Sequence, residues 1–144
     1  MMDKTKNNKL ISIADKELQT SSILNVKEGS IKDSYNGSVA ALSVSVAMSG
    51  LRPTLAIYYH KEDRKNVLEI ITKMLLNSNN EYYKFGSVRK DGVDIRVTNA
   101  ESLLKYAFYC NDEQLKVLQR NFIDCAIALK QVIRTYKLKK DEND

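Results

Sequence analysis

Apolar residues recur every three or four positions through most of the chain, which is the spacing of one buried helical face. The helices that this pattern predicts cover about residues 10–26, 31–49, 53–60, 66–76, 99–109 and 112–136. Residues 1–9 are polar and basic, so we expect a frayed start, and residues 137–144 form a charged tail. The pattern therefore predicts an all-α protein, a single compact bundle of about five or six helices in one domain over residues 1–144.

One segment departs from the helical period. Residues 88–97 alternate apolar and polar positions on either side of Asp91-Gly92, a pair that favours the tight turn of a β-hairpin. A two-stranded ribbon is only marginally stable unless other elements pack on it. Two alternatives therefore stay open near residues 85–97, one short β-hairpin or an irregular loop.

Eighteen consecutive residues, 34–51, carry no charge in a chain in which 28% of residues are charged. The stretch is rich in alanine and serine and closes on Gly50, which is typical of a helix end. Small residues let neighbouring helices come close. We therefore expect this helix to be covered on most of its sides and to form the centre of the fold.

Two segments contain helix-start signals. Thr98 and Glu101 have the spacing of a capping box, in which each side chain binds the backbone amide of the other residue. The helix that starts there is expected to bury Phe108. Asn111 is a second cap, and the helix after it is predicted to run to about Tyr136, a length of about 38 Å.

Composition supports a helical bundle and limits the class of protein. The chain has no tryptophan, one proline and five glycines, which are few turn residues for a β-sandwich. A net charge of +5 and an isoelectric point near 9.1 favour a polyanionic partner, although many soluble proteins carry as much charge without one. No secretory leader opens the chain, and the uncharged stretch is too polar to span a bilayer. We expect a cytoplasmic protein with no membrane partner.

Catalysis finds little support in the residues. His60 is the only histidine and has no neighbouring ligands at metal-binding spacing. Cys110 and Cys125 are the only cysteines, and their apolar neighbours favour buried, inert thiols. The sequence contains no glycine-rich phosphate loop and no nucleophile motif. We therefore expect a protein that is not an enzyme and that has no metal site and no cofactor.

On a helical wheel the last helix separates into an apolar face and an opposite face that carries five cations. These cations, which we call the basic ridge, are Lys116, Arg120, Lys130, Arg134 and Lys137. Acidic residues are few there, with Glu113 and Asp124 at the margin. Cations spread along about 30 Å suit several backbone phosphates better than one small anion, so the ridge predicts a nucleic-acid contact. A solvated charged face is the alternative.

Two further groups are candidates for contact. Ile123 and Ile127 fall on the outer face beside the basic ridge, and we interpret them as a contact with a protein neighbour. A second set of cations brackets the short third helix and is a weaker candidate for phosphate contact, because Glu62 and Asp63 lie within it. This set consists of Arg52, Lys61, Arg64 and Lys65. Most of the eight tyrosines are expected to pack inside the bundle rather than to stack on bases.

Several of these features together resemble a known family. Tyr35 opens the uncharged helix, and residues 49–59, SGLRPTLAIYY, follow it with a lysine two positions later. These residues, and residues 122–129, FIDCAIAL, resemble the small all-helical subunit of the type III-B CRISPR effector, the Cmr complex. The resemblance covers about residues 31–76 and 98–133.

The resemblance implies a non-catalytic subunit of a guide-RNA effector that recognises and destroys foreign RNA. In that family several stacked copies form an inner filament beside the subunits that hold the guide. The implied partners are other subunits of the effector complex, further copies of this chain, guide RNA and target RNA. The alternatives are the small subunit of the type III-A complex, a helical protein-interaction module and a DNA-binding regulator, and an enzyme is the least supported class.

Overall fold

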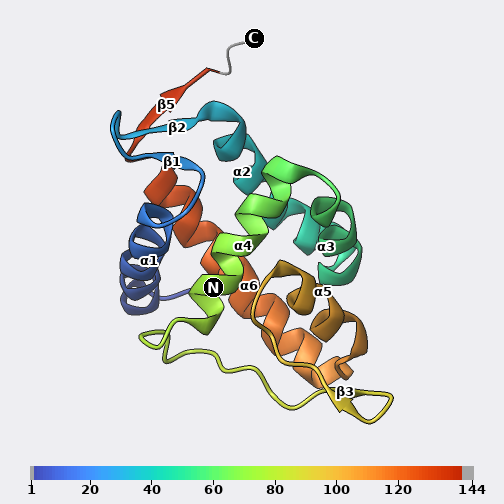
Figure 1. Ribbon diagram of the computed structural model, residues 1–144. Coiled ribbons are helices and arrows are strands. Elements are labelled where there is room, and N and C mark those ends of the chain that lie inside the picture. The colour runs from blue at the N-terminus through green and yellow to red at the C-terminus, as the bar shows by residue number, and fades with distance from the viewer. Residues whose placement is uncertain (1, 141–144) are drawn as a thin grey trace.

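The structure, a computed structural model, describes residues 2–140 (Figure 1). Within these residues the chain forms six helices and two small β-sheets. The helices are α1 (Lys4–Gln19), α2 (Asp33–Ser49), α3 (Leu51–Tyr59), α4 (Glu62–Leu76), α5 (Ala100–Tyr109) and α6 (Asp112–Ile133). The strands are β1 (Leu24–Asn25), β2 (Ser30–Lys32), β3 (Arg89–Lys90), β4 (Val93–Asp94) and β5 (Lys137–Lys139). Buried apolar side chains from all six helices form one cluster, which confirms the predicted helical bundle. No helix in the described range is long and apolar enough to cross a membrane.

The first helix begins and ends earlier than the sequence predicts. The Asp3 side chain accepts a hydrogen bond from the amide of Lys6 at 2.8 Å. This bond caps α1. Residues 4–9 are therefore helical, and the expected frayed start is wrong for them. At the other end, the hydroxyls of Thr20 and Ser21 donate to carbonyls of the last turn and compete with further helix, so α1 stops there.

The last helix, and not the uncharged one, lies at the centre of the bundle. Helix α6 packs against α1, α2 and α4 and passes through the middle of the molecule (Figure 1). Helix α2 buries only one face and leaves Val44 and Met48 exposed. The predicted central position of residues 34–51 is therefore wrong. Lack of charge permits burial but does not require it, and small side chains offer little apolar area to bury.

A glycine separates α2 from α3, as predicted. Gly50 has a φ of 92°, and its amide still bonds back to the last turn of α2. That region of φ favours glycine.

Hydrogen bonds at both ends of α2 join it to α6. The amide of Leu51 donates to Oε1 of Gln119 at 3.1 Å, which ties the α2–α3 junction to α6. At the other end of α2, Nε of Arg134 donates to Oδ1 of Asn36 at 3.4 Å. The two helices therefore run antiparallel, side by side.

Helix α4 begins at Glu62, four residues before the predicted start at residue 66, so residues 62–65 form its first turn. Glu62 and Asp63 lie at the start of this helix, where the unpaired amides favour negative charge. The polar run after Leu76 ends α4 where the sequence predicts.

Side-chain caps begin the last two helices. At α5 the Asn99 side chain accepts from the amide of Ser102, and the Ser102 hydroxyl accepts from the amide of Asn99. The capping box therefore lies one residue later than the predicted pair of Thr98 and Glu101, since asparagine is a stronger N-cap than threonine. Helix α6 starts at Asn111 as predicted.

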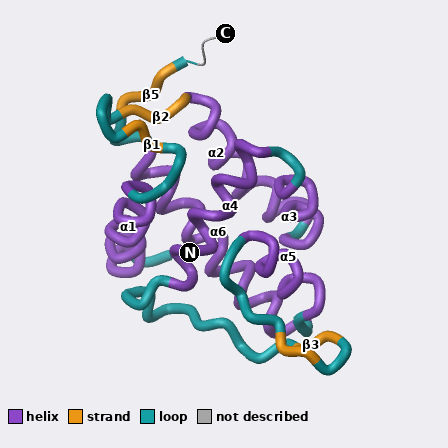
Figure 2. Tube along the Cα trace, viewed as in Figure 1, coloured by secondary structure: helices purple, strands orange, loops and turns teal. Residues whose placement is uncertain are grey.

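A long loop after α4 leads into a β-hairpin (Figure 2). Its strands β3 and β4 pair antiparallel. The turn between them is formed by the left-handed residues Asp91, with a φ of 54°, and Gly92, with a φ of 78°. Such a pair is typical of tight hairpin turns. The amide of Ile95 donates to the carbonyl of Val88 at 2.8 Å and extends the pairing. Of the two alternatives for this segment, the hairpin is confirmed.

The chain ends in a strand rather than in more helix. Helix α6 ends at Ile133, before the predicted end at Tyr136, and β5 pairs in parallel with β2. Because β2 also pairs antiparallel with β1, a small three-stranded sheet joins early and late parts of the chain. The Tyr136 hydroxyl donates to Asp15 at 2.7 Å and holds the turn against α1. Of the predicted charged tail, residues 137–139 form β5, and residues 141–144 lie outside the described residues.

Candidate nucleic-acid interface

The exposed face of α6 is a narrow strip, because α1, α2 and α4 cover the rest of the helix. Lys116, Arg120 and Arg134 are exposed on this strip, and Lys130 is half-buried. The four cations span about 27 Å along the helix axis. Within residues 2–140, no carboxylate forms an ion pair with any cation of the basic ridge.

A buried ion pair removes one acid from the margin of the ridge. Nζ of Lys6 lies 2.8 Å from Oδ2 of Asp124, and the two side chains are only 16% and 12% exposed. Lys6 also donates to Oδ1 of Asn121 at 3.1 Å and lies 5.3 Å from the centre of the Tyr82 ring. The Asp124 carboxylate is therefore neutralised inside the protein, and the strip outside it keeps its positive potential.

Lys137 does not lie on α6. It is exposed at the start of β5, after the turn that follows the helix, so its predicted position on the helical ridge is wrong. The physical reason is the early end of α6. The residue is only three positions beyond Arg134, so the cation stays at the same end of α6.

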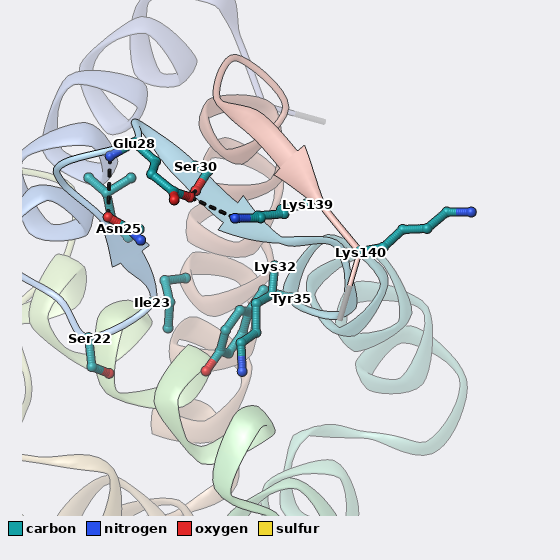
Figure 3. Close-up of a pocket in the computed structure, with 10 residues that line it drawn as sticks. Ser22, Ile23, Asn25, Glu28, Ser30, Lys32, Tyr35, Lys139 and Lys140 are labelled. Carbon is teal, nitrogen blue, oxygen red and sulfur yellow. Dashed lines mark hydrogen bonds and ion pairs between the residues drawn. The ribbon is translucent and has the colours of Figure 1, made fainter. Parts of the chain in front are cut away.

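A cleft of about 750 Å³ lies between the small sheet and the start of α2 (Figure 3). The Glu28 carboxylate forms an ion pair with Lys139 at 3.0 Å and accepts from the Ser30 hydroxyl at 3.2 Å. The hydrogen bond from Lys139 is the main reason that the pKa of Glu28 is lowered. Lys140 points away from the cleft (Figure 3). Because the Glu28 carboxylate lies in this cleft and already pairs Lys139, we do not assign the cleft to RNA.

The second predicted set of cations has other contacts. Nε and Nη2 of Arg52 donate to the carbonyls of Ala107 and Cys110 at 2.7 and 2.9 Å. The guanidinium thus caps the last carbonyls of α5, which helix geometry leaves unpaired. This structural role argues against the predicted phosphate contact of Arg52.

Arg64 and Lys65 lie against aromatic rings. The guanidinium of Arg64 is 4.9 Å from the centre of the Tyr58 ring, and Nζ of Lys65 is 4.8 Å from that of Tyr59. Such contacts attract a cation to the face of a ring. Both cations are half-buried, and Lys61 before them is exposed. Their contact with phosphate stays a prediction.

Ile123 and Ile127 are half-buried, and Ile123 packs against the core. More exposed apolar side chains lie elsewhere, on the neighbouring helices α2 and α3, namely Val44, Met48 and Ile57. We call these three residues the α2–α3 surface. This surface was not predicted, because α2 was expected to be covered on most of its sides. Val44 and Met48 are nevertheless four positions apart and lie on one helical face.

The reactive side chains considered in the sequence analysis are two buried thiols and one exposed histidine. Burial raises the pKa of the Cys125 thiol to about 12 and also raises the pKa of Cys110. His60 is exposed and lies edge-on to the ring of Tyr59. No group of three metal-ligating side chains occurs within residues 2–140.

Two aromatic side chains lie outside the core, and for Phe108 the predicted burial is wrong. Phe108 is 44% exposed and Tyr109 is 48% exposed, at the end of α5. The helical period predicts burial of Phe108, but α5 is short and only part of its circumference is covered by other elements.

The fold and the interface thus define a small helical protein whose central helix exposes a strip of cations that no described carboxylate pairs. The sequence profile of the family described as CRISPR-associated protein (Cas_Cmr5) matches residues 15–136. The chain therefore belongs to this family, the small subunit of the type III-B Cmr complex. No curated protein and no solved structure matches the chain. The predicted resemblance is confirmed, and the type III-A alternative is set aside.

Proposed function

We propose that the chain is a non-catalytic structural subunit of a guide-RNA-directed antiviral effector, and that the basic ridge on α6 holds target RNA or the guide–target duplex. In such effectors base pairing reads the sequence, so the protein needs only a sequence-independent hold on phosphates. One observation carries the proposal. Four cations lie along one face of α6, three of them exposed and Lys130 half-buried, with no carboxylate partner in the described residues.

We also propose that the chain acts as one helical domain in the cytoplasm, with several copies stacked in an inner filament. Its partners are then the other subunits of the complex, guide RNA and target RNA. The α2–α3 surface supports the protein contacts, since large exposed hydrophobics on neighbouring helices favour association. Ile123 and Ile127 contribute less, because they are half-buried.

The dependence of RNA affinity on salt tests the role of the ridge. Each phosphate contact on a single strand adds about 0.7 to the slope of log K against log salt concentration. The double variant Arg120→Ala/Arg134→Ala is therefore expected to bind RNA more weakly and to lower that slope by about 1.4. The measurement is a titration of labelled single-stranded RNA at several salt concentrations.

The matched control is Lys16→Ala/Lys73→Ala, which removes two exposed cations of α1 and α4 and the same net charge. This variant is expected to keep nearly the wild-type affinity and slope. If both double variants lose affinity equally, net charge and not the ridge drives binding. An unchanged slope in the ridge variant refutes the proposal.

A helical protein-interaction module is the competing function, and the exposure of Met48 and Ile57 favours it. RNA affinity separates the two, because both functions use the α2–α3 surface for protein contacts. If the chain is only such a module, the wild type has no RNA affinity, its binding to a protein partner is insensitive to salt, and Met48→Asp/Ile57→Asp abolishes that binding.

A further inference from the structure

The β3–β4 hairpin lies beside the end of α5 and is held firmly to the bundle (Figure 1). The rings of Phe85 and Tyr106 meet edge to face with centroids 5.0 Å apart, a favoured geometry for aromatic pairs. The Tyr106 hydroxyl accepts from the amide of Gly86 at 3.0 Å, and Nε2 of Gln114 donates to the carbonyl of Ser87 at 3.0 Å. The loop segment that leads into β3 is thus tied to both α5 and α6, so the hairpin has a defined position.

Neighbouring residues of β3 point to opposite sides of the ribbon. On one side Nε of Arg89 forms an ion pair with Asp94 across the hairpin at 2.8 Å. On the other side Nζ of Lys90 lies 4.8 Å from the centre of the Tyr109 ring. The hairpin therefore places a cation over an aromatic side chain that is nearly half exposed.

Tyr109 and Phe108 are consecutive aromatic residues at a fixed helix end. Arg52 holds the last carbonyls of α5, so the backbone that presents both rings is well anchored. Large exposed rings are costly to leave in water, and the core does not use these two. Tyr109 thus offers an exposed ring beside a cation, and Phe108 is the exposed ring next to it in the sequence.

The charges around the rings favour a polyanion. Four exposed cations, Lys84, Arg89, Lys90 and Arg96, belong to the hairpin and its flanks. The hairpin also carries two carboxylates, Asp91 and Asp94, and Asp94 is already paired with Arg89. The first turn of α6 is acidic, which directs phosphates to the hairpin side of the rings.

We propose that Tyr109, Phe108 and Lys90 form a stacking platform for unpaired bases of single-stranded RNA, with phosphates on the hairpin cations. An aromatic ring can stack on a base that has left the helix, whereas base faces inside a duplex are covered. The platform rests on the proposed function in that RNA lies on the chain. The platform uses different residues from the basic ridge, and it binds by stacking on bases rather than by attraction to phosphates. The two can therefore be tested separately.

The absence of tryptophan from the chain allows a direct spectroscopic test. Tyr109→Trp places one indole on the platform, and stacking of a base on it is expected to quench its fluorescence. The probe is a short single-stranded RNA with no self-complementarity. The control is Val26→Trp, an exposed position in the turn between β1 and β2 at the other end of the molecule (Figure 1). Its fluorescence is expected to stay unchanged.

Affinity measurements complete the test. Tyr109→Ala is expected to weaken binding of this RNA by about 5- to 100-fold, and Tyr109→Phe, which keeps the ring, is expected to restore it. Affinity for the same sequence as a duplex is expected to change less than about twofold, because paired bases do not use the platform. The salt slope is expected to stay the same, because no phosphate contact is lost. Unchanged circular dichroism and melting temperature establish that the variants fold.

The outcomes separate this proposal from the proposed function. Bound RNA that leaves the indole of Tyr109→Trp unquenched, or wild-type affinity in Tyr109→Ala, overturns the platform, while a loss in Arg120→Ala/Arg134→Ala still supports the ridge. A loss in Tyr109→Ala with an unaffected ridge variant supports the platform and refutes the ridge. A wild-type chain that binds no RNA overturns both.

Discussion

The buried pair between Lys6 and Asp124 leads to a specific stability prediction. Asp124→Ala leaves the Lys6 ammonium with the Asn121 oxygen as its hydrogen-bond acceptor among the described residues, in a site where little of its side chain reaches water. Removing one partner of a buried pair costs about 3–5 kcal/mol. The lower end applies here, because Lys6 lies in the first turns of α1 and its flexible chain can turn toward solvent. We expect a loss of about 3 kcal/mol in the free energy of unfolding.

Removing both charges is expected to cost much less. In Lys6→Met/Asp124→Leu no unpaired charge stays at this site, and apolar side chains of similar size fill it. In the double-mutant cycle formed by Lys6→Met, Asp124→Leu and this double variant, the coupling energy is then about 2 kcal/mol or more. In a chain of this size about 1 kcal/mol corresponds to about 2–4 °C in melting temperature, so Asp124→Ala is expected to melt about 6–12 °C lower.

Urea denaturation followed by far-ultraviolet circular dichroism at pH 7 measures these differences. Lys9→Met is the control, because Lys9 pairs with Glu81 at 2.7 Å on the surface of the protein. Exposed ion pairs contribute little to stability, so this variant is expected to unfold nearly as the wild type does. Two results would refute the reasoning. One is a loss below about 1 kcal/mol in Asp124→Ala, and the other is a double variant whose loss equals the sum of the two single losses.

Three further predictions concern the backbone, a helix end and a thiol. Gly50 has a positive φ, and a methyl group added there would meet only Cδ of Pro53, at 3.8 Å. Gly50→Ala is therefore expected to cost about 1–3 kcal/mol through backbone strain and not through collision, and urea denaturation that shows no loss would contradict this. Arg52→Ala is expected to cost about 1.5–3 kcal/mol by the same assay, because the carbonyls at the end of α5 lose a charged donor. Arg52→Lys is expected to restore little of it, since one ammonium cannot replace the guanidinium fork. Cys125, with its pKa of about 12, is almost entirely protonated at pH 8, so iodoacetamide is expected to leave it unmodified until denaturant is added. Rapid labelling of Cys125 in the native protein, detected by peptide mass spectrometry, would show that the thiol is accessible.

Local patterns were sufficient to predict the six helices and the β3–β4 hairpin, but not the strands β1, β2 and β5. The helical period, the Gly50 stop and the Asn111 cap depend on residues within a few positions of one another, and so does the Asp91-Gly92 turn. Errors arose where a neighbouring residue competed. Asn99 capped α5 in place of Thr98, and α6 ended before the position that its apolar period indicated.

The candidate interface was predictable in part for the same reason. Exposure of Lys116, Arg120 and Arg134 follows from the period of α6 alone. The pairing of Asp124 with Lys6 was not predictable, because the two residues are far apart in the sequence and meet only when α1 packs on α6. The inward hydrogen bonds of Arg52 depend in the same way on the position of α5.

By itself, the sequence determined the helical class, most helix boundaries, the family and the cations of the last helix, since each of these is encoded within a turn or a helical face. Only the tertiary structure decided that α6 and not α2 is central, which carboxylates are neutralised, and that Tyr109 is exposed beside Lys90. Burial and charge pairing depend on which helices pack together, and that is a property of the whole chain rather than of any one segment.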